Sequence, residues 1–562
     1  MRRITTIEFD GAGKRAIDNA KGRVVVTIVI FALCFSVISV RLVDLGLLSD
    51  AAQSAERGPA STGRQARADI VDRNGVLLAT DLETVSAYAK PSAIPDPQKA
   101  AMQLASVLPG VSAAELERKF RSGSSFTWVE RKLTPAEHAA IMRLGIPGVD
   151  FQTEIERVYP HGGLAAHLVG YTNVDGLGKG GVERYFNERL TRKGSGDEPL
   201  KLALDIRVQH VLRDRIATAV TEFKALGGAG LIVDVRTGEV VAMASLPDFN
   251  PNEPGSKIQD PAYMNRVSHA VYEMGSTYKT FTMAMALEHG IASIEDGYDA
   301  TDPIRIARFT ISDDHPKARW LSMPEIFMYS SNIASAKMAV EAGAEVQQAF
   351  LRSLGQLDRP DIELHEVGAP MAPQIWREIN IMTIAFGHGV AVSGLQLAKG
   401  FAALTNGGIM RPLTVMRADP AFPAGGKRVV SEKTSRQIQA LLRLVVEKGT
   451  GRKANAEGYL VGGKTGTAEK SGAGGYRRKA LLSSFIAVFP VTDPRYVVWV
   501  MIDEPKGNKS TFGYAGAGWT AAPTVRQVIE RAAPLLGVMP SDRETHPLVP
   551  TMLPLIQPEL RS

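Results

Sequence analysis

A long uncharged stretch near the N-terminus constrains the organisation of this chain more than any other feature. Residues 24–40 are seventeen consecutive uncharged, mostly apolar residues between Arg23 and Arg41. A helix of that length covers about 25 Å, slightly less than the roughly 30 Å of a bilayer core, and the flanking arginines can extend to the two interfaces. We therefore predict a single transmembrane helix over residues 24–45.

The charges that flank this stretch predict its orientation. Residues 1–23 hold six basic and three acidic residues, and loops rich in Lys and Arg stay in the cytoplasm. We expect a cytoplasmic tail over residues 1–23 and everything after the span outside the cytoplasm. A cleaved signal peptide is the alternative, but the apolar run exceeds the usual length and no A-x-A-like cleavage site follows it.

The overall composition excludes several classes of protein. The net charge is +6, from 65 basic and 59 acidic residues, and residues 1–23 supply half of it. The remaining chain is nearly balanced and shows no basic stripe, so we expect no nucleic-acid partner. The single cysteine, Cys34, excludes an intramolecular disulfide and a cysteine-based zinc site.

The region after the span predicts a mixed α+β domain over residues 46–225. Two short apolar runs flank Asn74-Gly75, which is typical of a β-hairpin over residues 69–79. Helical patterns occupy residues 95–149, and residues 150–159 resemble a strand. An amphipathic helix is expected over residues 201–226.

The rest of the chain predicts a second α+β domain over residues 226–540. Apolar runs predict a hairpin over 230–246 and strands over 459–469, 481–490 and 496–503, with helices between residues 275 and 450 and over 521–536. This order favours an antiparallel sheet of about five strands flanked by helices. The proline-rich tail, residues 541–562, is expected to be extended or disordered.

A serine and a lysine at the start of a predicted helix form the first candidate for chemistry. Ser276 and Lys279 are three residues apart, so they lie on one face of a helix. A lysine can remove the proton of a serine when burial and nearby positive charge lower its pKa. The alternative is a solvated lysine one turn after a capping serine.

A second polar pair lies at the entry to another predicted helix. Ser330 can pass a proton to a leaving group, and Asn332 can orient Lys279 or a substrate amide. Ordinary helix capping is the alternative for both residues.

A third candidate lies in a predicted strand, where Lys464 is followed by Thr465, Gly466 and Thr467. The two hydroxyls and the lysine make a binding site for a carboxylate, and the glycine lets a substrate backbone approach the strand. The alternative is a glycine in an edge strand or at a bulge.

The three motifs together, in this order, resemble those of penicillin-binding proteins and serine β-lactamases. The chain is most similar to a class B penicillin-binding protein of the septal, FtsI type, a peptidoglycan D,D-transpeptidase. Met274 departs from the family, since many relatives have proline there, and should alter loop stiffness without altering the chemistry. Further resembling segments are Asp72-Arg73-Asn74-Gly75, residues 157–160, Gly180-Gly181-Val182-Glu183, Asn265-Arg266, residues 272–276, Gly387-His388-Gly389, residues 464–468 and Ala521-Ala522-Pro523.

The resemblance implies a role for each candidate residue. Ser276 attacks the carbonyl of the penultimate D-alanine of a stem peptide, and Lys279 takes its proton. Ser330 passes a proton to the departing amine, Asn332 orients the site, and Lys464 keeps the relay electropositive. Thr465 and Thr467 bind the terminal carboxylate beside Gly466, and the backbone N–H groups of Ser276 and Thr467 form the oxyanion hole.

The resemblance also implies a fold, a location and partners. The fold is a penicillin-binding/serine β-lactamase-like transpeptidase domain after an elongated pedestal. The catalytic domain lies in the periplasm, anchored to the inner membrane. Expected partners are peptidoglycan stem peptides, as D-Ala-D-Ala donor and amine acceptor, β-lactams, a glycan polymerase and other membrane proteins of the division machinery. No cofactor or metal is expected.

Three other functions are weighed against the septal transpeptidase. An elongation-type class B transpeptidase shares the same chemistry. A β-lactamase or carboxypeptidase does not need the long region before the catalytic domain. A non-catalytic β-lactam-binding scaffold or sensor needs further spans and a cytoplasmic effector, which the sequence lacks.

Overall fold

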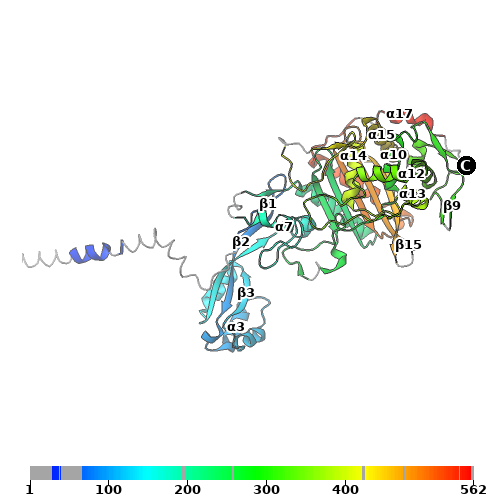
Figure 1. Cartoon of the computed structure of the whole chain (residues 1–562). Coiled ribbons are helices and arrows are strands. Elements are labelled where there is room, and N and C mark those ends of the chain that lie inside the picture. The colour runs from blue at the N-terminus through cyan, green and yellow to red at the C-terminus, as the bar shows by residue number, and fades with distance from the viewer. Residues whose placement is uncertain are drawn as a thin grey trace, which may run out of the picture. The chain divides into compact units, whose positions relative to one another are not determined.

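A computed structural model describes residues 28–36, 38–39, 66–192, 198–255, 259–307, 309–419, 425–472, 475–542 and 545–557. These residues belong to two compact units, one made of residues 1–64 and 84–154 and the other of residues 65–83 and 155–562. The predicted domain over residues 46–225 is therefore shared between both units. Figure 1 shows the order of the elements along the chain.

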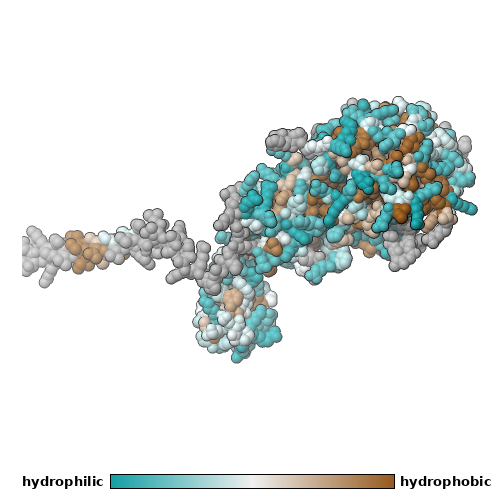
Figure 2. Space-filling model, viewed as in Figure 1, coloured by the Kyte–Doolittle hydropathy of each residue, from teal (hydrophilic) through white to brown (hydrophobic). Residues whose placement is uncertain are grey.

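The predicted membrane span falls only partly within the described residues. Residues 28–36 and 38–39 are helical, and apolar side chains such as Phe31 and Phe35 are exposed, so this segment is brown in Figure 2. Within the described part of the chain, no helix combines the length and apolar character that a membrane crossing needs. The rest of residues 24–45 lies outside the described residues, and the span stays a prediction.

The smaller unit packs three helices on a short sheet. The helices are α3 (Pro97–Val107), α4 (Ala113–Phe120) and α5 (Pro135–Leu144), as the pattern over residues 95–149 predicts. Leu104, Leu116 and Ile141 form part of its core. The sequence did not predict strand β3 (Thr127–Leu133), in which three consecutive charged residues interrupt the apolar alternation.

In the larger unit, residues 65–83 and the first segment after residue 155 precede the central sheet. Strand β1 (Ile70–Val71) pairs with the start of β2 (Leu77–Ala89), which confirms the hairpin at Asn74-Gly75. Strand β1 also pairs in parallel with β5 (Leu200–Lys201). Helix α9 (Ile206–Glu222) follows, with Asp205 as its N-cap, so the predicted helix over residues 201–226 is confirmed with shorter bounds.

A buried ionic cluster holds the early segments of this unit together. Glu183 accepts from Arg67 at 2.6 Å and from Arg157 at 2.7 Å, and Arg157 also contacts Asp81 at 3.2 Å. All four side chains are nearly inaccessible to solvent. Each buried charge therefore has an opposite partner, without which its burial would be strongly destabilising.

The central sheet of the larger unit is antiparallel and has five strands in the order β14-β15-β16-β6-β7. The strands are β6 (Gly227–Asp234), β7 (Val240–Leu246), β14 (Gly462–Gly472), β15 (Gly475–Phe489) and β16 (Tyr496–Asp503), so the predicted five-stranded sheet is confirmed. In Figure 1 the green strands of the early chain lie beside the orange strands of the late chain. Strand β14 forms one edge.

Both faces of this sheet are covered by helices. Along β16, Val498 and Val500 pack with α9 and α16 (Ala521–Leu535), while Trp499 and Met501 pack with the helices of the opposite face. This alternation follows from the two-residue period of a strand. The opposite face carries α10 (Lys279–Glu288), α14 (Gly394–Thr405) and α15 (Glu432–Lys448).

The prediction of an extended or disordered C-terminal tail is wrong for residues 545–557. A short helix, α17 (Val549–Met552), buries Val549 and Met552. Pro550 lies in the first helical turn, where a missing N–H has no cost. The tail packs on α15, and Gln557 donates its backbone N–H to Glu325 at 2.9 Å.

Candidate active site

Ser276 and Lys279 come together through a tight turn. Residues Gly275–Tyr278 form a 3-10 helix, η7, that leads directly into α10 at Lys279. In a 3-10 helix, side chains three residues apart are eclipsed, and Lys279 Nζ lies 3.2 Å from Ser276 Oγ. Lys279 is only 2% exposed, which excludes the alternative of a solvated lysine.

The residue before the serine must be glycine. Gly275 has a φ of +54°, and a Cβ atom there would lie 2.7 Å from the carbonyl oxygen of Thr467. A side chain would meet both a conformational penalty and a backbone collision. Gly275 thus lets the Ser276 turn pack directly against strand β14.

Lys279 connects two segments that are distant in sequence. Its Nζ atom lies 3.0 Å from Ser330 Oγ and 2.6 Å from Asn332 Oδ1, and it also contacts the Ser330 carbonyl oxygen. With Ser276, this makes four oxygen atoms around one buried nitrogen. The structure therefore brings together the first two sequence motifs.

An unusual backbone conformation presents Ser330 to Lys279. Helix α11 (Met323–Tyr329) ends at Ser330, whose φ of +63° and ψ of +48° are left-handed. A non-glycine residue in this region carries strain, which is concentrated at functional sites. Ser330 is the C-cap of α11 through its backbone, whereas Ser331 is the N-cap of the next helix, α12 (Asn332–Ser353), so N-capping does not account for the Ser330 hydroxyl.

The third motif lies on the edge strand β14. Lys464 Nζ lies 2.9 Å from Ser330 Oγ, which joins this motif to the other two. Thr465 Oγ1 is 2.9 Å from Thr450 Oγ1, and Thr467 Oγ1 accepts from the Ala517 N–H at 3.1 Å. The strand thus contributes a lysine to the same hydroxyl that Lys279 contacts.

The structure gives Gly466 a packing role within the chain. A Cβ atom at Gly466 would lie 2.6 Å from the Met274 carbonyl oxygen and 2.7 Å from Thr277 Cγ2. The close approach that the glycine permits is therefore between β14 and the Ser276 turn of the same chain. The approach of a substrate backbone to the strand at this glycine stays a prediction.

Burial changes the acid–base behaviour of both lysines. Loss of solvent lowers the pKa of Lys279 to about 8, although the carboxylates of Asp313 and Asp314 oppose this shift. Burial, with the nearby positive charge of Lys279, lowers the pKa of Lys464 well below its usual value. An amine whose pKa is near neutrality is suited to take a proton from a hydroxyl.

Sequence reasoning missed one residue of this site, Asp313. Its carboxylate accepts from Ser331 Oγ at 2.8 Å and from the backbone N–H groups of Asn332 and Ile333 at 2.6 and 3.0 Å. Asp313 lies eighteen residues before Ser331 on a different segment. No local pattern could have found it, because the contact forms only when the two segments meet.

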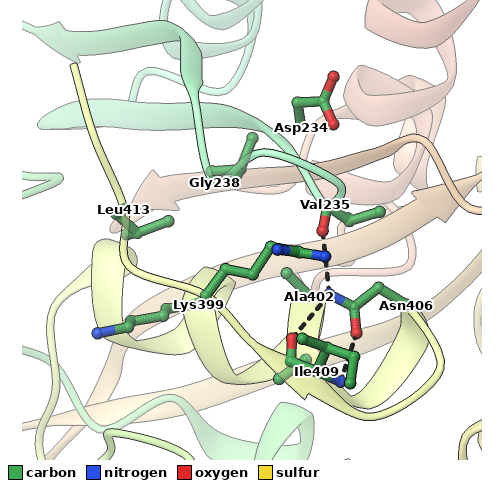
Figure 3. Close-up of a pocket in the computed structure, with 11 residues that line it drawn as sticks. Asp234, Val235, Gly238, Lys399, Ala402, Asn406, Ile409 and Leu413 are labelled. Atoms are coloured by element: carbon green, nitrogen blue, oxygen red, sulfur yellow. Dashed lines mark hydrogen bonds between the residues drawn. The ribbon is translucent and has the colours of Figure 1, made fainter. Parts of the chain in front are cut away.

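Two other places in the chain lie outside the three motifs. The His388 loop packs on the segment before Ser276, where Gly275 donates its N–H to the Gly387 carbonyl at 3.2 Å. A separate cavity beside Asp234, Gly238 and Lys399 is shown in Figure 3. Its volume of about 10 Å³ holds at most about one water molecule, so it is too small for a peptide.

The comparisons with known proteins agree with this geometry. Residues 228–530 match the penicillin-binding protein transpeptidase domain, and residues 63–198 match the penicillin-binding protein dimerisation domain. A probable peptidoglycan D,D-transpeptidase FtsI from Caulobacter vibrioides is 39% identical, covering 94% of this chain and 91% of the relative. The peptidoglycan D,D-transpeptidase FtsI of Escherichia coli K12 is 32% identical, covering 80% and 81%.

A solved structure gives the same result for the catalytic region. The apo transpeptidase domain of Burkholderia pseudomallei penicillin-binding protein 3 is 30% identical with a TM-score of 0.55, covering 62% of this chain and 99% of that one. The three motifs, the five-stranded sheet and these relatives lead to one conclusion. The chain belongs to the class B penicillin-binding proteins and is a peptidoglycan D,D-transpeptidase of the FtsI type.

Proposed function

We propose that this enzyme cross-links stem peptides during septal wall synthesis, with Ser276 as the nucleophile. The observation that carries the assignment is the position of Lys279 Nζ, 3.2 Å from Ser276 Oγ and 3.0 Å from Ser330 Oγ. One buried amine thus reaches both the candidate nucleophile and the candidate proton relay.

Acylation begins when Ser276 Oγ attacks the carbonyl carbon of the penultimate D-alanine. Neutral Lys279 takes the hydroxyl proton as the new C–O bond forms. The C–N bond to the last D-alanine then breaks, and the proton reaches the departing amine through Ser330. The products are an ester on Ser276 and free D-alanine.

Deacylation repeats these steps in the opposite direction. The amine of a neighbouring stem peptide attacks the ester carbonyl and loses a proton to the same relay. The C–O bond to Ser276 breaks, and the hydroxyl recovers its proton. A β-lactam acylates Ser276 by the first step and stays bound.

The strand β14 supplies the binding groups in this proposal. Thr465 and Thr467 hold the terminal carboxylate of the donor, and Lys464 donates to Ser330. The backbone N–H groups of Ser276 and Thr467 stabilise the oxyanion. Removing one such donor typically lowers the rate by about 100- to 1,000-fold. The packing of Gly275 against the Thr467 backbone supports this pairing.

Labelling with a fluorescent penicillin tests the nucleophile. The Ser276→Ala variant should lose covalent labelling, while Ser510→Ala, at an exposed position of a short 3-10 helix, should be labelled like the parent. Labelling of the Ser276→Ala variant at full strength would remove Ser276 from this role.

Depletion in cells tests the septal assignment. Cells that lose a septal enzyme continue to elongate and form filaments, whereas loss of an elongation enzyme gives rounded, swollen cells. The names of the FtsI relatives support the septal role. Rounded cells on depletion would assign this chain to elongation.

We propose further that residues 24–45 anchor the enzyme in the inner membrane and that the catalytic unit lies in the periplasm. The charge of residues 1–23 and the extracytoplasmic substrate support this topology. A glycan polymerase and other division proteins of the membrane are the proposed partners. Protease accessibility in spheroplasts tests the topology, because only a periplasmic domain is digested before lysis.

A further inference from the structure

A loop outside the three motifs is hydrogen-bonded to the second motif. Residues 312–319 connect strands β10 (Phe309–Ile311) and β11 (Trp320–Ser322). The Asp313 carboxylate in this loop accepts three hydrogen bonds at 2.6–3.0 Å from Ser331, Asn332 and Ile333. Asp313 therefore supplements the Ser331 cap at the start of α12, where a negative charge is also favoured by the helix dipole.

The same loop fixes which atom of the Asn332 amide faces Lys279. Asn332 Nδ2 donates to the Ser312 carbonyl oxygen at 2.8 Å. The amide oxygen is thereby left on the side of Lys279, whose Nζ lies 2.6 Å from it. A flipped amide would present two N–H donors to the lysine and would lose the bond to Ser312.

We propose that Asp313 is a positioning residue for acyl transfer, which holds the first turn of α12 so that the Asn332 amide oxygen is fixed toward Lys279. The proposal rests on the assignment of Ser276 and Lys279 as nucleophile and base. Asp313 itself touches neither Ser276 nor Lys279 by any hydrogen bond among the described residues. Its effect on the reaction passes through Asn332.

Several charged groups act on Lys279 and must be separated in a test. Asp313 and Asp314 favour its protonated form. Lys464 and His388 also lie close enough to interact with it, and Glu273 acts in turn on His388. Removing the charge of Asp313 or Asp314 shifts the pKa of Lys279 downward, so the acidic limb of the acylation profile moves to lower pH in either variant.

The plateau of the profile distinguishes position from charge. Asp314 is exposed, and Asp314→Asn should move the acidic limb without lowering the plateau. Asp313→Asn should move the limb in the same direction and also lower the plateau, because an amide cannot accept from both Ser331 and the α12 backbone. A misplaced catalytic group of this kind costs up to about 100-fold in rate.

A double-mutant cycle tests whether Asp313 acts through Asn332. The rate of acylation by a fluorescent penicillin is measured on the full chain in detergent for Asp313→Ala, Asn332→Ala and the combined variant. Each single variant should be about 10- to 100-fold slower than the parent. The combined variant should be no slower than the slower single variant, because both changes remove the same interaction.

The controls separate this proposal from folding and from the nucleophile assignment. Asp296→Asn removes the charge of an exposed carboxylate outside the three motifs, which accepts from the Ser293 N–H at 2.7 Å. This variant should be acylated at the same rate as the parent. Where Asp313→Ala does not fold, Asp313→Asn takes its place in the cycle. If the Ser276→Ala variant is labelled by the fluorescent penicillin, Ser276 is not the nucleophile. The role proposed for Asp313 then fails with that assignment.

Two results overturn the positioning role while Ser276 remains the nucleophile. One is an Asp313→Ala variant that acylates within about twofold of the parent at every pH. The other is a combined variant that is slower by the product of the two single effects, which means that Asp313 and Asn332 act independently.

Discussion

Lys279 and Lys464 share one hydroxyl, with their Nζ atoms 3.0 and 2.9 Å from Ser330 Oγ. The first lysine begins helix α10 and the second lies on strand β14. A hydroxyl has two lone pairs and one proton, so it can accept from both amines or donate to one of them. Ser330 is therefore placed to pass a proton between the two sides of the site.

The rate of acylation should depend on the protonation of Lys279. Its pKa of about 8 means that the neutral base predominates above pH 8 and decreases about tenfold for each pH unit below it. We expect the acylation rate constant for a β-lactam to rise from pH 6 to pH 8 and then level off. A pH-independent rate over this range would contradict Lys279 as the base.

Two substitutions of Ser330 should separate its hydroxyl from its backbone strain. Both Ser330→Ala and Ser330→Gly remove the hydroxyl, and loss of a proton-transfer group typically costs about 100- to 10,000-fold in rate. Only glycine adopts the left-handed conformation without strain, so we expect Ser330→Gly to be more stable than Ser330→Ala by about 1 kcal/mol. Urea unfolding measures the stability difference. Equal stability of the two variants would show that the φ of +63° carries no cost.

Replacing Gly275 should damage the site, and another glycine offers a matched control. Gly275 and Gly290 have φ values of +54° and +65°, but only Gly275 has backbone atoms in the place of a Cβ. We expect Gly275→Ala to slow acylation by about 100-fold or more, because Ser276 moves away from Thr467. Gly290→Ala should lose about 1 kcal/mol of stability and keep its activity. Similar acylation by both variants would contradict the close packing at Gly275.

Neutralising Glu183 should destabilise the fold without affecting the chemistry. In Glu183→Gln, the buried guanidinium group of Arg67 loses its ion-pair partner and that of Arg157 keeps only Asp81. Removing one partner of a buried ion pair typically costs about 3–5 kcal/mol. The exposed Glu188 provides the control, and Glu188→Gln should unfold like the parent. Chemical denaturation measures both, and a change below about 1 kcal/mol in Glu183→Gln would refute the role of the cluster.

Local periodicity predicted the central sheet well. Residues 496–503 are almost entirely apolar, which is typical of a strand buried on both faces, and β16 has these bounds. The hairpin turns at Asn74-Gly75 and at residues 236–238 followed from turn chemistry. Strand β3 was missed because three consecutive charged residues interrupt its alternation. The short helix α17 was missed because its buried side chains pack against the distant helix α15.

The sequence predicted those residues of the candidate site that belong to the three motifs. The order of Ser276-Lys279, Ser330-Asn332 and Lys464–Thr467 indicated a common site, and the hydrogen bonds of Lys279 and Lys464 join all three. The contribution of Asp313 and the left-handed Ser330 were not predictable. Both arise where one segment meets another, and neither changes the composition or spacing of the motifs.

Helix α10 is solvent-inaccessible along most of its length, from Lys279 to Ala286. Any change of side-chain volume on this helix alters the packing of the core, and such changes typically cost several kcal/mol. We therefore expect variation that reduces β-lactam reactivity while keeping the enzyme folded to lie outside α10. Selection for antibiotic resistance should accumulate there and leave the helix that carries the base unchanged.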